Sequence, residues 1–146
     1  MVRDELMAFE RCNCMVLRKA ARRVSHFYDA MLAPTGLRAT QYSILALLDE
    51  LEAVSINDLA RHLDLDRTTA GKNLRPLAMA KLIKIAPSAA DQRSRTAKLT
   101  DKGIATLKTA RPLWRRAQAE FEGSNGKKLS KNLRHTLASL TVHGAE

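Results

Sequence analysis

The feature that most constrains the fold of this chain is a change of apolar period within residues 55–99. A helical pattern of apolar side chains stops at Asp64-Leu65-Asp66, starts again, and then gives way to two short β-prone runs. Asp66 is well suited to begin the second helix, because its carboxylate can accept hydrogen bonds from the amides of Thr68 or Thr69. The segment therefore predicts a helix, a short turn, a second helix and a β-hairpin.

The second of these helices has two different faces. Its buried face is predicted from apolar residues at helical spacing, which are Ala70, Leu74, Leu77 and Ala78. Its other side carries cations, hydroxyls and a glycine, which are Arg67, Thr68, Thr69, Gly71, Lys72 and Arg75. Arginine can form two hydrogen bonds with guanine, threonine can meet a thymine methyl or a phosphate, and glycine permits close approach. This face indicates either insertion into a DNA major groove or an ordinary solvated helix surface.

The hairpin after this helix favours the DNA interpretation. Strands are predicted over residues 82–85 and 96–99, with the turn starting at Pro87, and residues 53–55 can add a third strand. The tip and the returning strand carry Asp91, Arg93, Arg95 and Lys98. A hairpin with a cationic tip after a helix-turn-helix is the winged-helix layout, in which the tip reaches a neighbouring groove or phosphate chain. Residues 61–100 contain nine Lys or Arg against three Asp, so this segment is predicted to bind DNA.

Another helix is predicted upstream, over residues 40–51. Thr40 and Gln41 lie near its start, where backbone amides and side chains are candidate phosphate contacts. Pro76 lies inside the second helix of the motif, where its ring removes an amide donor and crowds the preceding turn. We therefore expect that helix either to kink at this proline or to end near Arg75.

Length and charge narrow the class of function. A chain of 146 residues is enough for one domain with a modest core. A formal net charge of +10 favours a polyanionic partner, with nucleic acid first and an anionic membrane surface second. A basic RNA- or ribosome-associated interaction module fits the charge alone. Since no apolar run approaches the roughly 18 residues of a membrane span and the first residues lack a signal-peptide pattern, we expect a cytoplasmic protein without a membrane partner.

The remaining chemically reactive residues do not form a catalytic pattern. The two cysteines lie two positions apart and the four histidines are scattered, so no metal site is expected. The sequence shows no glycine-rich phosphate loop, no nucleophile elbow and no pair of catalytic carboxylates. We therefore expect neither an enzyme nor a cofactor.

Three further helices are expected outside the motif. They are predicted over residues 5–33, 101–122 and 129–142, with a turn at residues 123–126. Asp101 is the expected N-cap of the second, and Pro112 should bend it. The first helix has two apolar stripes, so it must be covered on more than one side, as a second copy of the chain would do. The predicted fold is mainly α with a small antiparallel β-wing: a winged helix-turn-helix at 36–100, with dimerisation helices at 5–33 and 101–146.

Three motifs give a resemblance to a known family. The wing and the start of the next helix contain Asp91-x-Arg93 and then Leu99-Thr100-x-Lys102-Gly103. Upstream stand Gly36-Leu37-x-x-Thr40-Gln41-Tyr42-x-x-Leu45 and Leu59-Ala60-x-x-Leu63. These motifs resemble the MarR family of bacterial transcription regulators, over nearly the whole chain from about Cys14 onward. The resemblance implies a homodimer on a palindromic operator, often a repressor released by a small ligand or an oxidant.

The same resemblance draws attention to the cysteines. Cys14 falls where the OhrR-like, organic-hydroperoxide-sensing branch of the MarR family has its reactive cysteine. Tyr28 matches one tyrosine of that sensor pattern, but Arg18 and Ala39 stand in place of two others. The resemblance thus implies a redox role for Cys14, with Cys12 as the neighbouring thiol. Because residues two apart in one helix point about 200° apart, a disulfide would join two subunits or a small thiol. The alternative is a small buried residue at a dimer contact.

If no thiol switch operates, release from DNA requires a ligand. The expected pocket lies between the winged region and the dimerisation helices, and His26, Tyr28 and Tyr42 are the candidate lining residues. Six aromatic residues and many cations make an aromatic or other organic anion the expected ligand. Trp114 is expected to be a packing residue rather than a ligand platform.

Overall fold

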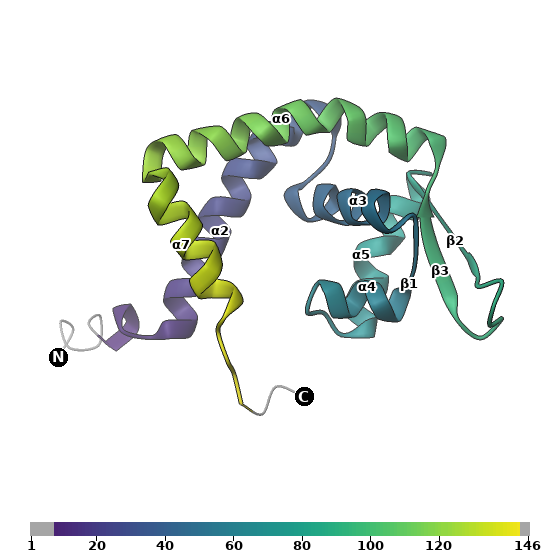
Figure 1. Cartoon of the computed structure of the whole chain (residues 1–146), viewed down its shortest axis with the longest axis horizontal. Coiled ribbons are helices and arrows are strands. Elements are labelled where there is room, and N and C mark those ends of the chain that lie inside the picture. The colour runs from purple at the N-terminus through teal and green to yellow at the C-terminus, as the bar shows by residue number, and fades with distance from the viewer. Residues whose placement is uncertain (1–7, 144–146) are drawn as a thin grey trace.

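The computed structural model describes residues 8–143 and divides into two parts joined by one long helix (Figure 1). The elements are α2 (Asn13–Leu32), the 3-10 helix η1 (Ala33–Thr35), α3 (Ala39–Leu51), β1 (Ala53–Ser55), α4 (Ile56–His62), α5 (Arg67–Met79), β2 (Ile83–Pro87), β3 (Arg95–Leu99), α6 (Asp101–Asn125) and α7 (Lys127–Ala138). We call residues 37–99 the winged head. We call α2, α7 and the part of α6 that contacts them the helical arm. The mainly helical fold with a small antiparallel sheet is confirmed.

The helix-turn-helix of the winged head begins each helix with a side-chain cap. The hydroxyl of Ser55 accepts a hydrogen bond from the amide of Asp58 at 3.1 Å, so α4 starts directly after β1. The Asp66 carboxylate accepts one from the amide of Thr69 at 3.0 Å, which confirms Asp66 as the N-cap of α5. Between the helices Asp64 has a positive φ of 50°, where the chain reverses.

The wing is a three-stranded antiparallel sheet in the order β1-β3-β2, so the predicted third strand is confirmed. Ala97 of β3 lies opposite Val54 of β1 and Ile85 of β2, and this row faces the core. The adjacent row places Lys98 opposite Lys84, and both lysines are exposed. The alternation of one buried and one solvated face is what a strand period of two produces.

The core lies between α3, α4, α5, the sheet and the first half of α6. Its fully buried leucines include Leu45, Leu48, Leu59 and Leu74. Trp114 of α6 stacks on Tyr42 of α3, with ring centroids 5.7 Å apart and an interplanar angle of 16°. The prediction that Trp114 is a packing residue is therefore confirmed.

Several predicted helix boundaries were wrong. The first helix was expected from about Glu5, which lies outside the described residues, but within them the helix is interrupted at Arg11–Cys12 and α2 begins at Asn13. Of the two alternatives at Pro76, a kink or an end near Arg75, the second is excluded, because α5 continues through Pro76 to Met79. A proline removes only one donor, and the buried face formed by Leu74 and Leu77 holds the helix on the core on both sides of it.

Helix α6 also departs from its expected ends. Its N-cap is Thr100 rather than Asp101, because the Thr100 hydroxyl accepts a hydrogen bond from the amide of Gly103 at 3.0 Å. It continues through most of the expected turn at residues 123–126 and ends at Asn125, followed by Gly126 at a φ of +89°. Helix α7 is correspondingly earlier than the predicted 129–142.

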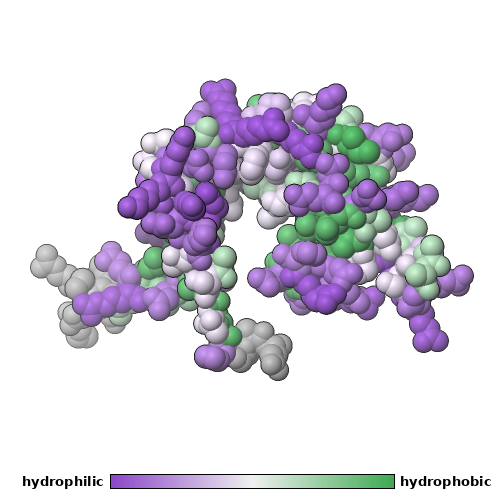
Figure 2. Space-filling model, in the orientation of Figure 1, coloured by the Kyte–Doolittle hydropathy of each residue, from purple (hydrophilic) through white to green (hydrophobic). Residues whose placement is uncertain are grey.

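The helical arm leaves apolar side chains uncovered. In this chain α2, α7 and their neighbours expose large apolar residues, which are Phe9, Val16, Leu17, Val24, Leu129, Leu133, Leu137, Leu140 and Val142. Figure 1 shows α6 crossing from the sheet to the arm, and Figure 2 shows a mostly hydrophilic outer surface hollowed between the two parts beneath α6. Within residues 8–143, no helix is both long enough and apolar enough to traverse a bilayer.

Candidate nucleic-acid interface and cavities

The first turns of α5 present a polar, cationic surface. Arg67, Thr68, Lys72 and Arg75 are all exposed, while Ala70, Leu74 and Leu77 on the other side are buried in the core. Gly71 lies half-buried on this helix, and a methyl group added there would meet nothing within 4 Å. The surface is therefore open to an approaching partner at the position of the glycine. The predicted division of α5 into a buried and a solvated face is confirmed.

Thr69 differs from the other candidates on α5 because its hydroxyl is already engaged. Both the amide and the hydroxyl of Thr69 donate to the Asp66 carboxylate. The hydrogen bonds from Thr69 lower the pKa of Asp66, because they stabilise the ionised carboxylate. Thr69 therefore anchors the start of α5.

The tip of the wing is shaped by Asp91. Its carboxylate accepts a hydrogen bond from the amide of Arg93 at 3.0 Å, and its carbonyl accepts one from the amide of Ser94 at 3.0 Å. The amide of Ser88 then donates to the carbonyl of Ser94 at 2.7 Å and closes the loop. These bonds fix the backbone that carries Arg93 and Arg95, whose side chains are exposed. Asp91 thus has a local structural role at the tip.

The wing and α5 meet around a hollow of about 210 Å³, which we call the wing hollow. Its lining includes Arg67 from the start of α5, Arg93 and Arg95 from the wing, and Asn57 from α4. Its lining contains three arginines and one acidic residue, Asp91, so the hollow is net cationic. None of these arginines belongs to an ion pair among the pairs found within residues 8–143. Such a site suits a phosphate group.

Sequence reasoning missed Asn57 in this group. The residue lies in the first turn of α4, and only the antiparallel pairing of β1 with β3 brings that turn beside the wing. The sequence signal that could have identified Asn57 is the start of a helix directly after a predicted strand. Of the upstream candidates, Thr40 is exposed on α3, whereas the Gln41 side chain accepts a hydrogen bond from the amide of Arg38 at 3.0 Å. Gln41 therefore helps to cap α3.

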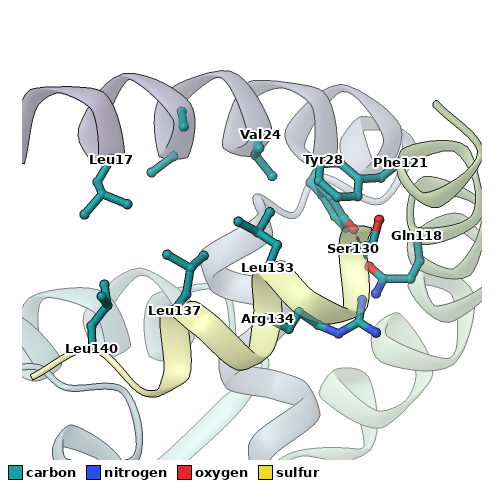
Figure 3. Close-up of a pocket in the computed structure, with 12 residues that line it drawn as sticks. Leu17, Val24, Tyr28, Gln118, Phe121, Ser130, Leu133, Arg134, Leu137 and Leu140 are labelled. Carbon is teal, nitrogen blue, oxygen red and sulfur yellow. Dashed lines mark hydrogen bonds between the residues drawn. The ribbon is translucent and has the colours of Figure 1, made fainter. Parts of the chain in front are cut away.

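An apolar cavity of about 560 Å³, here called the arm groove, separates α2 from α7. Figure 3 shows Leu17 and Val24 of α2 pointing toward Leu133 and Leu137 of α7 across it, with Phe121 at one end. At that same end Tyr28 donates a hydrogen bond to Gln118, and Arg134 forms an ion pair with Glu122 at 3.3 Å. Burial and then the charge of Glu122 raise the pKa of Tyr28, so its hydroxyl keeps its proton. The groove is thus apolar with one polar end.

A smaller hollow lies where arm and head meet. This junction hollow measures about 280 Å³ and is lined by residues of α2, α3 and α6, including Tyr28, Ser43, Trp114 and Gln118. Of the predicted effector residues, Tyr28 lines both this hollow and the arm groove. Tyr42 is buried behind it against Trp114. His26 is exposed on α2 and lines neither cavity.

Comparison with known proteins places this geometry in a family. The MarR family model matches residues 37–94, which is the winged head as far as the wing tip. The transcriptional regulator MosR of M. tuberculosis, solved in complex with DNA, is 36% identical, with 88% of this chain and 92% of MosR covered at a TM-score of 0.80. The chain belongs to the MarR family.

Two further transcription regulators are similar to this chain. The HTH-type transcriptional regulator TtmR of Methylorubrum extorquens is 30% identical over 101 residues, which are 69% of this chain. The match spans about half of TtmR, 52% of its length. The transcriptional repressor CouR, solved on a 23-mer DNA duplex, is 29% identical, with 89% of this chain and 92% of CouR covered at a TM-score of 0.79.

The sequence predicts both cysteines of this MarR family member within one helix, but only Cys14 lies in α2. Cys12 is the N-cap of α2, in an extended conformation with φ −74° and ψ 111°, and Cys14 is exposed in the first turn. Because Cys12 is not helical, the separation of about 200° between residues two apart in a helix does not hold for this pair. Both cysteines are free thiols. Within residues 8–143 no group of three or more His, Cys, Asp or Glu side chains is arranged to hold a metal ion.

Proposed function

We propose that this MarR family protein is a sequence-specific DNA-binding transcription regulator in which α5 reads the major groove and the wing reaches the adjacent minor groove. The observation that carries the proposal is the wing hollow. It joins Arg67 at the start of α5 to Arg93 and Arg95 of the wing on one cationic surface. A phosphate of the DNA backbone between the two grooves would meet all three guanidinium groups there. The relatives MosR and CouR, solved with DNA, support the same assignment.

The second part of the proposal is that the protein acts as a homodimer on a palindromic operator. The arm groove supports this, because α2 and α7 present apolar side chains to a space of about 560 Å³ that neither helix fills. An apolar helix from a second copy would bury these residues on both chains at once, as an isologous interface requires. Two reading helices would then enter successive major grooves about 34 Å apart.

The third part is that the regulator is a repressor released by a small aromatic or other organic anion bound in the junction hollow. Trp114 lines that hollow and is the single tryptophan of the chain, so its emission reports occupancy directly. Benzoate and phenylacetate serve as probes. We expect them to quench Trp114 emission and to release DNA over the same concentration range. Ser43→Leu, which fills the hollow, should abolish both effects.

The DNA-binding proposal is tested with a duplex selected by the wild-type protein from a random-sequence library. Arg93→Ala should weaken binding to that duplex by at least about fivefold, since a wing arginine contacts base edges or phosphates. Arg115→Ala removes an exposed arginine of α6 and is the matched control, with no change expected. Affinity should also fall steeply with salt, because bound phosphates release counterions. Unchanged affinity in Arg93→Ala would remove the wing from the interface.

A second candidate function is that of a thiol-based peroxide sensor, favoured by the exposure of Cys14. A peroxide can reach this thiol directly, and oxidation there would alter the start of α2. Treatment with cumene hydroperoxide should release DNA from the wild type but not from Cys14→Ser. Equal release from both proteins rules this function out. A monomer in light scattering, without preference between duplexes, would instead favour the RNA- or ribosome-associated module.

A further inference from the structure

The turn that follows α5, residues 80–82, is hydrogen-bonded to the start of α6 and its cap. Helix α5 ends in a Schellman motif. The amide of Leu82 donates to the carbonyl of Leu77 at 2.9 Å, and the amide of Lys81 donates to the carbonyl of Ala78 at 3.0 Å. Lys81 has a φ of 59°, a left-handed conformation that glycine usually provides. The turn leaves the carbonyl groups of Ala80, Lys81 and Leu82 outside the helix, free to accept other donors.

All three of these consecutive carbonyls accept hydrogen bonds from the first residues of α6 and its cap. The Lys102 ammonium donates to Ala80 at 2.9 Å, the Thr100 hydroxyl to Lys81 at 2.6 Å and the Thr100 amide to Leu82 at 3.1 Å. The Thr100 hydroxyl also accepts from the amide of Gly103 and so caps α6. A single side chain therefore joins the C-terminus of one helix to the N-terminus of the next.

The backbone packing at this joint is as close as the hydrogen bonding. Gly103 of α6 lies directly on Leu82, and a Cβ at Gly103 would overlap the Leu82 carbonyl oxygen. The Lys102 ammonium lies at the negative end of the α5 dipole, where a cation is favourable. From this joint α6 runs without interruption to Asn125, where it contacts the helices of the arm.

We propose that Thr100 and Lys102 are positioning residues, which lock the reading helix to α6 so that each reading helix takes its orientation from the arm. The inference rests on the proposed DNA binding by a dimer. In such a dimer the distance and angle between the two reading helices depend on this joint. The reason is that the carbonyls after α5 are bonded to the start of α6, and α6 extends to the helical arm where the partner would bind. The joint thereby determines which half-site spacing the dimer accepts.

The test compares the selected duplex with the same duplex carrying one additional base pair between its half-sites. The wild type should bind the longer duplex at least about tenfold more weakly, since the insertion shifts and rotates one half-site. Lys102→Met keeps the aliphatic stem and removes the donor, and it should reduce this spacing penalty at least about threefold. Lys108→Met, an exposed lysine of the same helix, should keep the full penalty.

A second measurement requires no DNA. Amide hydrogen exchange over residues 78–83 and 96–103 should accelerate at least about threefold in Lys102→Met and in Thr100→Val, but not in Thr100→Ser, which keeps the hydroxyl. If exchange and spacing penalty both match the wild type in Lys102→Met and Thr100→Val, the joint does not position α5 and the inference is overturned. If the wild type selects no duplex at all, the proposed function fails. In that case, hydrogen exchange that is unaltered in Lys102→Met and Thr100→Val still overturns the inference that Thr100 and Lys102 position α5.

Discussion

The winged head buries its apolar helix side chains, whereas the helical arm leaves many of its own exposed. In the head, Leu45 of α3 and Leu74 of α5 are fully buried, whereas Leu133 and Leu137 of α7 in the arm are 40% and 42% exposed. Both parts are helical, and both carry apolar residues at helical spacing. They differ in what surrounds those residues. The head has a sheet and several short helices to enclose a core, while α2 and α7 face each other across the arm groove.

This difference shows that periodicity alone does not decide burial. An amphipathic helix gains stability only when another surface covers its apolar face, at about 1.5–3 kcal/mol for a fully buried leucine. In the head that surface belongs to the same chain, so its stability is set within one molecule. In the arm these apolar side chains stay exposed within one chain, and the proposed dimer would supply the covering surface. We therefore expect the state of the arm, and not that of the head, to follow protein concentration.

The largest effect should come from placing charge in the arm groove. The double variant Leu133→Asp/Leu137→Asp should be monomeric where the wild type is dimeric, with the dimer dissociation constant raised at least about 1000-fold, because both carboxylates would be desolvated. Light scattering after size exclusion gives the mass directly. Leu51→Asp is the matched control, since Leu51 is 38% exposed but lies in the head, and it should stay dimeric. A dimeric double variant would mean that the arm groove is not the interface.

A smaller effect separates the head from the arm. Leu45→Ala removes a fully buried side chain from the head and should lower the free energy of unfolding by about 3 kcal/mol. The same loss, within about 0.5 kcal/mol, is expected in the monomeric Leu133→Asp/Leu137→Asp background, because distant sites add. Urea denaturation followed by circular dichroism measures both. A much smaller loss in the monomeric background would show that the head needs the arm in order to fold, which contradicts the comparison.

The sequence was most informative about the head because its signals there are local. The cap at Asp66, the alternation along β3 and the apolar face of α5 each depend on neighbours only a few residues away. Of the candidate DNA contacts, Arg67, Thr68, Lys72, Arg75, Arg93 and Arg95 are exposed on the head. Their contact with DNA stays a prediction, which the binding experiments on Arg93→Ala begin to test.

The features that sequence reasoning missed depend on contacts between distant segments. Thr100 rather than Asp101 caps α6, because its hydroxyl is also held by the Lys81 carbonyl, nineteen positions away. Gly103 was noted only as part of a family motif, and its physical reason is the close passage over Leu82. Pro76 does not end α5, since packing of the helix on the core outweighs the loss of one amide donor. In each case tertiary contact decides between choices that the local sequence leaves open.

The smallest effect concerns Lys81, where the head meets α6. A lysine at a φ of 59° is strained relative to glycine, so Lys81→Gly should raise the free energy of unfolding by about 0.5–1 kcal/mol. Lys84→Gly removes an exposed strand lysine instead and should lower it. Because the strain lies in the backbone of the head, the gain from Lys81→Gly should persist in the monomeric double variant. A gain seen only in the dimer would mean that the arm imposes this conformation on the turn, and that head and arm are not independent.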